Sequence, residues 1–171
     1  MTGPSPLTAF SSYLDGRHQV LLSVAAEILG HLDACGAGEA VAPSASRARA
    51  SDLMWLWTLG AYEVVRTMCQ ARACFSARFF AAISDLKFDL ERVRVPSTKM
   101  ERIKYNRRDP SIPVSSDRAP DSWDERNRDL RVGDPADSAS ARRLLGDYAR
   151  VMASLTVDDV LLRHEASFVG S

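Results

Sequence analysis

Large apolar residues recur every three or four positions in four stretches of the chain, which is the period of one face of an α-helix. In the first stretch, from Pro6 to about Ala34, the face consists of Phe10, Tyr13, Leu14, Val20, Leu21, Val24, Ile28 and Leu32. The stripe predicts a long amphipathic helix with these residues buried. Gly16 marks the place where this helix could loosen.

Residues 51–96 form the most apolar stretch and hold two of the three Trp and four of the six Phe. Ser51 or Asp52 is expected to cap the first helix of this stretch, because either side chain can accept a bond from an amide of the first turn. Ser76 is expected to start a second helix, whose buried stripe is Phe79, Ile83, Leu86, Leu90 and Val93. Pro96 ends it. We expect a hairpin of two helices, since a single helix would be about 65 Å long.

Helical periodicity disappears between residues 97 and 133, where three prolines and few apolar side chains occur. A segment of this kind is typically functional or disordered. Its charge is uneven, with seven Lys or Arg against one Glu over residues 92–108 and eight acids against four Arg over residues 109–137. Residues 112–114 could be extended, but Pro113 keeps them out of a central sheet.

The fourth stripe follows Asp134, which is expected to be a helix N-cap with Pro135 at the first helical position. Its predicted buried face is Ala141, Leu144, Leu145, Tyr148, Val151, Met152 and Leu155. Thr156 is expected to cap a short last helix that extends to about Glu165.

These stripes predict an all-α fold, an antiparallel bundle of four to five helices with one long irregular connection over residues 97–133. The length of 171 residues fits a single domain over residues 1–171. The alternative is a helical domain with a small β-ribbon in the irregular segment.

Composition limits which partners and which cellular compartment we expect for the protein. Basic and acidic residues balance at 22 each, which argues against a purely electrostatic partner such as duplex DNA or a membrane surface. The three cysteines have no CxxC spacing, so we expect reduced packing residues in a cytoplasmic protein. The chain has no run of 18 apolar residues, and we expect no membrane partner.

A polar seam interrupts the apolar residues 51–73 and provides the ligand-pocket candidates Tyr62, Glu63, Arg66 and Gln70. Helical spacing places Glu63, Arg66 and Gln70 on one side. In a functional interpretation, Glu63 is an acid or base, or Arg66 holds an anion. The structural interpretation, which we favour, is a buried or half-buried ion pair that fixes helix register. We assign no catalytic residue.

A basic run provides the nucleic-acid candidates Arg94, Lys99, Arg102, Lys104, Tyr105, Arg107 and Arg108. The cations could contact phosphates while Tyr105 stacks on a base. The acidic stretch that follows at once argues against this interpretation, because charge runs are usually only solvated.

Glu27, His31 and Cys35 follow one another at steps of four, a spacing that could place three ligands on one helix face. A zinc site normally has a second ligand pair, such as CxxC or HxxxH, and the sequence has none. We therefore expect no metal and no cofactor. His18 and His164 are isolated, and each is expected at the surface or at a helix end.

Trp55 and Trp57 are two residues apart and point about 200° away from each other on a helix. One is expected in the core, and the other against a second helix or in a subunit interface, where Trp is enriched. Self-association as a homodimer is therefore expected, with Trp55 and Trp57 as interface candidates.

The runs LWTLGAYEVVRTMCQ, LERVRVPSTKME and SARRLLGDYARVM resemble small uncharacterised bacterial helical proteins whose layout is HEPN-like. The resemblance covers about two thirds of the chain and implies a helical bundle. HEPN ribonucleases are defined by an Arg followed four to six residues later by a His, and no Arg here has such a partner. The resemblance therefore assigns RNA cleavage to no residue of this chain.

The sequence favours a non-catalytic binding protein with residues 97–133 as the arm that contacts a protein partner. The alternative is an enzyme that cleaves RNA or handles nucleotides through Glu63, Arg66 and the basic run over residues 92–108.

Overall fold

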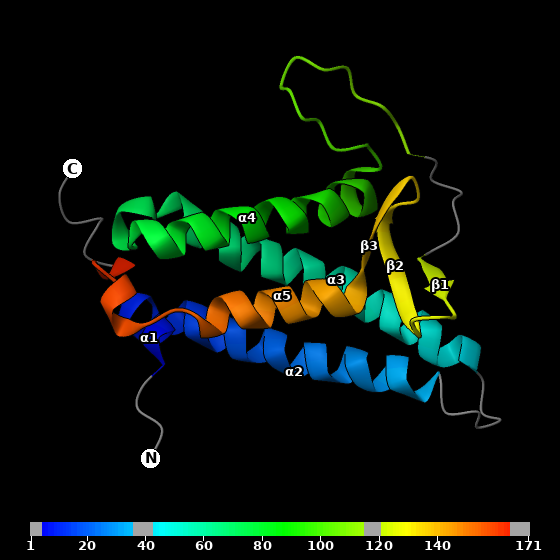
Figure 1. The fold of residues 1–171 in the computed structure, drawn as a ribbon, viewed down its shortest axis with the longest axis horizontal. Helices are drawn as coiled ribbons and strands as arrows, with labels where there is room; N and C mark the ends of the chain where they lie inside the picture. Colours follow the sequence, from blue (N-terminus) through cyan, green and yellow to red (C-terminus); the bar gives the residue numbers. More distant parts are fainter. Residues whose placement is uncertain (1–4, 36–42, 115–120, 165–171) are drawn as a thin grey trace.

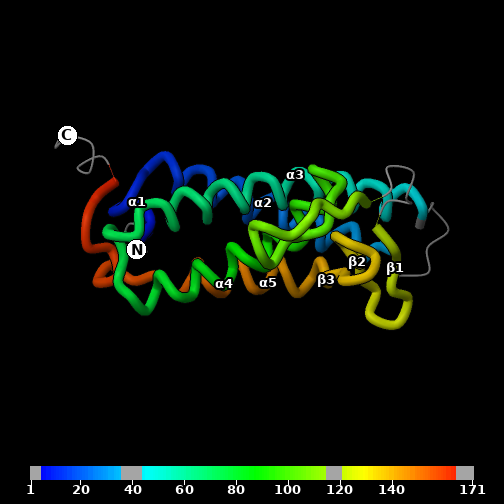
Figure 2. The backbone as a smooth tube through the Cα atoms, turned by 90° about the horizontal axis from the view of Figure 1, so that it is seen from above, coloured from blue at the N-terminus to red at the C-terminus, as the bar shows by residue number. Residues whose placement is uncertain are grey.

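Four long helices form an antiparallel bundle in the computed structural model, which describes residues 5–35, 43–114 and 121–164 (Figure 1). The helices are α2 (Ser12–Ala34), α3 (Pro43–Gln70), α4 (Ala77–Arg94) and α5 (Ala141–Ala153). Seen from above, α3 and α4 lie side by side over α2 and α5 (Figure 2). The short α1 (Pro6–Phe10) packs at one end of the bundle. The predicted helical bundle is thus confirmed as the main architecture.

The first predicted helix is broken in two at Ser11. The backbone of Ser11 is extended, and its Oγ accepts a hydrogen bond from the Leu14 amide at 3.3 Å, which caps α2. Most of the predicted stripe faces the core, but Tyr13 and Val20 are exposed. The prediction that these two residues are buried was wrong, because the apolar stripe of α2 is wider than the face that α3 covers.

Helix α3 begins at Pro43, well before the predicted cap at Ser51. The added turns carry few large apolar residues, but Ala50 is fully buried. Arg49 pairs with Glu27 of α2 at 3.2 Å, and Arg47 pairs with a glutamate beyond the first strand at 3.0 Å. These tertiary contacts therefore extend the helix toward its N-terminus. The period of apolar residues in the sequence does not reveal them.

The apolar stripes predicted for α4 and α5 are confirmed, because all of their residues are buried. The centre of the core is formed by Trp57 of α3 and Tyr148 of α5, whose ring centroids are 5.3 Å apart in an edge-to-face arrangement. Between α3 and α4, a 3-10 turn (Arg72–Cys74) makes the predicted hairpin connection.

A three-stranded antiparallel sheet covers one end of the bundle, so the fold is not purely all-α (Figure 1). Its strands are β1 (Ser122–Asp124), β2 (Asp129–Asp134) and β3 (Asp137–Ser140), in the order β1-β2-β3. Leu130 and Val132 of the central strand are buried against the bundle. The sheet lies mostly in and just after the segment that was expected to be irregular, as in the alternative prediction of a β-ribbon.

The predicted helix start at Asp134 is wrong, because Asp134 is the last residue of β2 and Pro135 lies in the turn between β2 and β3. The Asp134 carboxylate accepts a hydrogen bond from the Ala136 amide at 2.9 Å, which is the contact of an Asx turn. Helix α5 is capped by Ser140 instead, whose Oγ accepts from the Arg143 amide at 3.0 Å.

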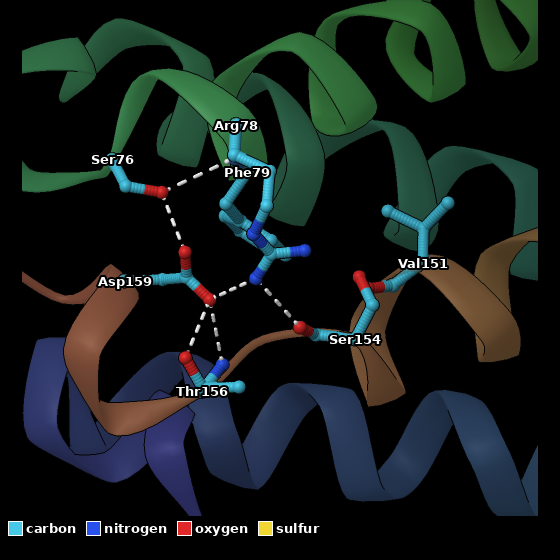
Figure 3. A network of polar contacts seen from close by, with 7 residues as sticks. All are labelled: Ser76, Arg78, Phe79, Val151, Ser154, Thr156 and Asp159. Atoms are coloured by element: carbon cyan, nitrogen blue, oxygen red, sulfur yellow. Dashed lines mark hydrogen bonds and ion pairs between the residues drawn. The ribbon is translucent and has the colours of Figure 1, made fainter.

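A capping box at Thr156 starts a single 3-10 turn, η3 (Val157–Asp159), rather than a helix reaching Glu165, which lies outside the described residues. Asp159 reaches back from this turn to the start of α4, where its carboxylate accepts hydrogen bonds from Ser76 and Arg78 (Figure 3). The end of the described chain is thereby joined to the α3–α4 hairpin.

Gly133 should be intolerant of substitution, because its φ of +95° is unfavourable for any residue with a side chain. A Cβ at this position would also lie 3.3 Å from the Val93 Cα. We expect Gly133→Ala to lower the free energy of unfolding in urea by about 1 to 3 kcal/mol. The matched control is Gly146→Ala in α5, where a Cβ meets nothing within 4 Å and a small gain in stability is expected. Equal effects at the two sites would contradict this account.

Candidate functional site

A groove of about 440 Å³ runs along the surface between α2 and α3, and we call it the α2/α3 face. The two helices approach closely at Gly60, where a Cβ would lie 3.0 Å from Leu21. About one turn away along α3, the indole Nε1 of Trp57 donates a hydrogen bond to the Leu21 carbonyl at 3.1 Å. These contacts fix the relative level of the two helices.

Large apolar side chains are exposed on the α2/α3 face, namely Tyr13 (67% exposed), Val20 (55%) and Leu56 (55%). Charged groups lie among them. The guanidinium of Arg17 stacks 4.9 Å from the Tyr13 ring centroid, and Glu63 lines the α3 side. Aromatic and aliphatic side chains with an arginine on an exposed surface are typical of protein interfaces.

The predicted polar seam on α3 is divided between two surfaces. Tyr62 is buried, with the guanidinium of Arg94 stacked 4.4 Å from its ring centroid. Glu63 lines the α2/α3 face, whereas Arg66 and Gln70 line a hollow toward α4. The Glu63 carboxylate accepts a bond from Arg66 at 2.7 Å, and both side chains are about half exposed. The predicted pair is therefore present and half-buried, and pairs this exposed contribute little to stability.

The two tryptophans separate as the helical angle predicts. Trp57 is the core residue, and its burial in the folded chain removes it as an interface candidate. Trp55 is 46% exposed, and it points toward α4 rather than to the α2/α3 face.

Residues 100–114 form a projecting loop that we call the arm (Figure 1). Two backbone hydrogen bonds close its base, from the Arg102 amide to the Ile112 carbonyl at 2.8 Å and from the Val114 amide to the Met100 carbonyl at 2.7 Å. Glu101 and Pro113 form an isolated bridge there, so the extended piece expected at 112–114 is present outside the sheet. Residues 115–120 of the predicted irregular segment lie outside the described residues.

The structure divides the nucleic-acid candidates into three groups. Arg94 packs on Tyr62, and the Arg102 guanidinium pairs with Asp134 at 3.1 Å. Lys99 is exposed just before the arm. Exposed on the arm itself are Lys104, Tyr105, Arg107 and Arg108. Among the described residues, no carboxylate forms an ion pair with the three cations of this last group.

A second cavity, of about 410 Å³, lies where α3 meets the end of α4, the turn η2 (Val95–Lys99) and β2; we call it the α3/α4 pocket. Its walls are mainly apolar, with Met54, Trp55, Leu59, Val93 and Val132. Its polar lining comes from Ser51, Asp52, Thr58, Arg94, Ser97, Thr98 and Asp121. Sequence reasoning missed this site, because its residues come from segments that are far apart in the chain.

His18 was expected at the surface or at a helix end, but it lies within α2 and is half-buried. Its Nδ1 lies 3.1 Å from the Tyr148 hydroxyl. Burial lowers the pKa of His18, although the nearby Asp15 opposes the shift, and burial raises the pKa of Tyr148. A neutral pair of ring and hydroxyl groups therefore lies beside the core at neutral pH.

The structure shows no metal site at the three described residues Glu27, His31 and Cys35, the potential ligands along α2 and its C-cap. His31 lies 3.8 Å from Glu27, which also pairs with Arg49. In the part of the chain that the structure describes, no three His, Cys, Asp or Glu side chains converge so as to hold a metal ion. His164 packs its ring edge-to-face on Phe10.

Comparisons with known proteins add no family to this description. No protein-family model, no curated protein and no solved structure matches the chain. Within the described residues, every helix is too short or too polar to cross a membrane. The α2/α3 face, the arm and the α3/α4 pocket are therefore the candidate sites, each argued from its own chemistry.

Proposed function

We propose that this chain is a non-catalytic cytoplasmic binding protein that forms a homodimer through the α2/α3 face. The observation that carries the proposal is an exposed apolar groove that presents Arg17 on one helix and Glu63 on the other. A surface that holds both signs of charge around apolar groups is complementary to a second copy of itself.

The registry of α2 and α3 supports this arrangement. Leu21 lies opposite Gly60, and the helices are antiparallel, so Arg17 lies level with Val64 and next to Glu63. A two-fold axis in the plane of the face, parallel to the two helices and midway between them, would lay α2 of one copy on α3 of the other at the same level. It would bring Arg17 of one copy against Glu63 of the other.

The same axis would pair the apolar groups. Tyr13 precedes Arg17 by about one turn, and Thr67 follows Glu63 by about one turn of the antiparallel helix, so the two are level. The axis would therefore bring Tyr13 near the Thr67 of the second copy, Val20 near its Gly60 and Leu56 near its Val24. Burial of exposed apolar area is the main favourable term in such an association.

A charge placed in the groove tests this proposal. We expect the unaltered chain to sediment as a dimer and Val20→Glu to sediment as a monomer, because the new carboxylate would have to be desolvated in the interface. Val157→Glu is the matched control, since Val157 is 63% exposed in η3 and does not line the groove. The control should remain a dimer. A monomeric parent chain, or equal loss of the dimer in both variants, would refute the proposal.

The arm supports a second contact with a protein partner, as the sequence suggested for residues 97–133. Its tip is held by the Asn106 side chain, which accepts a bond from the Arg108 amide at 3.1 Å, and by an Asp109 carboxylate bonded to the Asn106 amide at 3.0 Å. Tyr105, 72% exposed, stands beside the Phe88 ring of α4. A shaped loop that presents an aromatic group and cations suits recognition of an acidic surface.

The alternative function, a HEPN-like enzyme that cleaves RNA or handles nucleotides, is favoured by the same cations of the arm. It would also require chemistry at Glu63 and Arg66. We favour the binding function because these two side chains form an exposed ion pair of the ordinary helix-surface kind, and because Glu63 belongs to the groove that the dimer uses.

A further inference from the structure

The α3/α4 pocket has the dimensions of a small-molecule site. Its volume of about 410 Å³ falls within the range typical of ligand pockets, roughly 300 to 1,000 Å³. Like those pockets, it combines mainly apolar walls with a few polar groups. The exposed face of Trp55 forms part of the wall, and a large indole that is open to the pocket can cover the apolar body of a ligand.

Carboxylates gather at one end of the pocket. Asp52, Trp55 and Leu59 are three and four residues apart along α3, so they share one helix face. The neighbouring Ser51 donates a hydrogen bond to the Asp121 carboxylate at 2.7 Å, which brings a second acid to the same end. Two carboxylates at the edge of an apolar cavity attract a positively charged group.

A cation lies toward the other end. The Arg94 guanidinium rests on the Tyr62 ring, and Tyr62 follows Asp52 by ten residues along α3, which is about 15 Å of helix. Because Arg94 also lines the pocket, its charge is separated from the carboxylates by the apolar middle of the cavity. The Ser97 and Thr98 hydroxyls line the wall that α4 and η2 provide.

The charges of Asp52 and Arg94 do not neutralise each other inside the chain. Among the described residues, neither Asp52 nor Arg94 forms an ion pair, although most surface charges of α3 and α4 have a partner. The Nε of Arg94 is also buried without a hydrogen-bond partner among those residues.

We propose that the α3/α4 pocket binds a small zwitterion with an apolar body. Its ammonium group lies toward Asp52 and Asp121, its carboxylate accepts from Arg94, and its body packs against Trp55. The site adjoins the proposed dimer interface at Leu56, which lines both surfaces, but Arg17, Val20 and Glu63 do not line it.

A set of matched probes tests this assignment by isothermal titration calorimetry on the full chain. The probe is 8-aminooctanoate, which has an ammonium group and a carboxylate at the two ends of an apolar chain. Octanoate lacks the ammonium group, octylamine lacks the carboxylate, and 6-aminohexanoate is shorter. We expect 8-aminooctanoate to bind at least about tenfold more tightly than octanoate or octylamine, because only it pairs with both ends.

Variants of the pocket test which end of 8-aminooctanoate lies near which charged residue. Asp52→Asn should weaken the binding of 8-aminooctanoate about tenfold and leave the binding of octanoate unchanged, whereas Arg94→Gln should weaken both and leave octylamine unchanged. Asp158→Asn, an exposed aspartate in η3 away from the pocket, is the control and should change nothing. Asp52 is itself exposed, so its variant tests the proposal even if Arg94→Gln fails to fold. Absence of binding, equal affinity for the three eight-carbon probes, or no effect of Asp52→Asn would overturn the assignment.

Discussion

Replacing Asp159 by alanine should lower the free energy of unfolding by about 2 to 4 kcal/mol. The Asp159 side chain is almost completely buried, and its two oxygens accept bonds from three residues in two parts of the chain (Figure 3). The Ser76 hydroxyl donates at 2.5 Å, and the Thr156 amide and hydroxyl donate at 3.0 and 2.7 Å. Arg78 donates to the same carboxylate. Because Ser76 also caps α4, the variant should loosen the join between η3 and the helix hairpin.

The exposed charge of Arg78 limits this effect, because water can solvate the guanidinium once the carboxylate is removed. The neighbouring Asp158→Ala is the control. Asp158 is exposed, and its loss should change stability by less than about 0.5 kcal/mol. Urea unfolding of both variants measures the difference, and equal stability of the two would show that the Asp159 network contributes nothing.

The contribution of Asp159 should depend on pH. Hydrogen bonds from Ser76, Thr156 and Arg78 hold the pKa of this carboxyl well below its usual value. The unfolded chain therefore takes up a proton at a higher pH than the folded chain does, and stability falls as pH falls. The difference between the parent chain and Asp159→Ala should be complete above about pH 5 and shrink progressively below about pH 4. A difference that stays constant down to pH 2 would contradict this assignment.

Reversing one charge on the α2/α3 face should weaken dimerisation at least about tenfold. In the proposed two-fold dimer each pair occurs twice, so Arg17→Glu would place a glutamate against Glu63 at both contacts. Glu63→Arg would likewise place an arginine against Arg17 at both contacts. The matched control is Arg150→Glu in α5, an exposed arginine outside the groove, whose variant should dimerise like the parent. Sedimentation velocity over a range of concentrations measures all three.

The parts of the fold that periodicity predicted are those where one helix face meets one neighbour. The stripes from Phe79 to Val93 and from Ala141 to Leu155 became the buried faces of α4 and α5 because each packs on the bundle along its whole length. The spacing of apolar residues in the sequence does not show how much of a helix surface its neighbours cover. For that reason Tyr13 and Val20 were expected in the core and are exposed on α2.

The favoured all-α prediction lacked the sheet, which only the alternative of a small β-ribbon included, because the sequence signals of its strands are short and ambiguous. The run from Asp134 to Asp137 has the acid, proline and acid of a helix start, and the same residues suit a tight turn. Tertiary contacts decide between the helix start and the turn. The preceding Gly133 adopts a positive φ against Val93 of α4, and Leu130 and Val132 bury on the end of the bundle.

For the candidate sites too, the sequence predicted features of a single helix and missed those that depend on packing between segments. Helical angles correctly separated Trp57 from Trp55, since that property belongs to a single helix. The α3/α4 pocket joins Asp52, Arg94 and Asp121, and no local spacing relates residues from three different segments. Glu63 and Arg66 were rightly placed together, but only packing could show that α3 leaves them exposed and divides them between two surfaces.

Mixing the two charge-reversed chains, Arg17→Glu and Glu63→Arg, tests the proposed dimer most directly. In each mixed dimer the introduced glutamate would face the introduced arginine, and the unaltered Glu63 of one copy would face the unaltered Arg17 of the other. Both contacts therefore become attractive again. The account predicts that each variant alone is mainly monomeric in sedimentation velocity and that an equimolar mixture dimerises about as strongly as the parent chain. A mixture that remains monomeric while the parent dimerises, or variants that dimerise unchanged on their own, would contradict it.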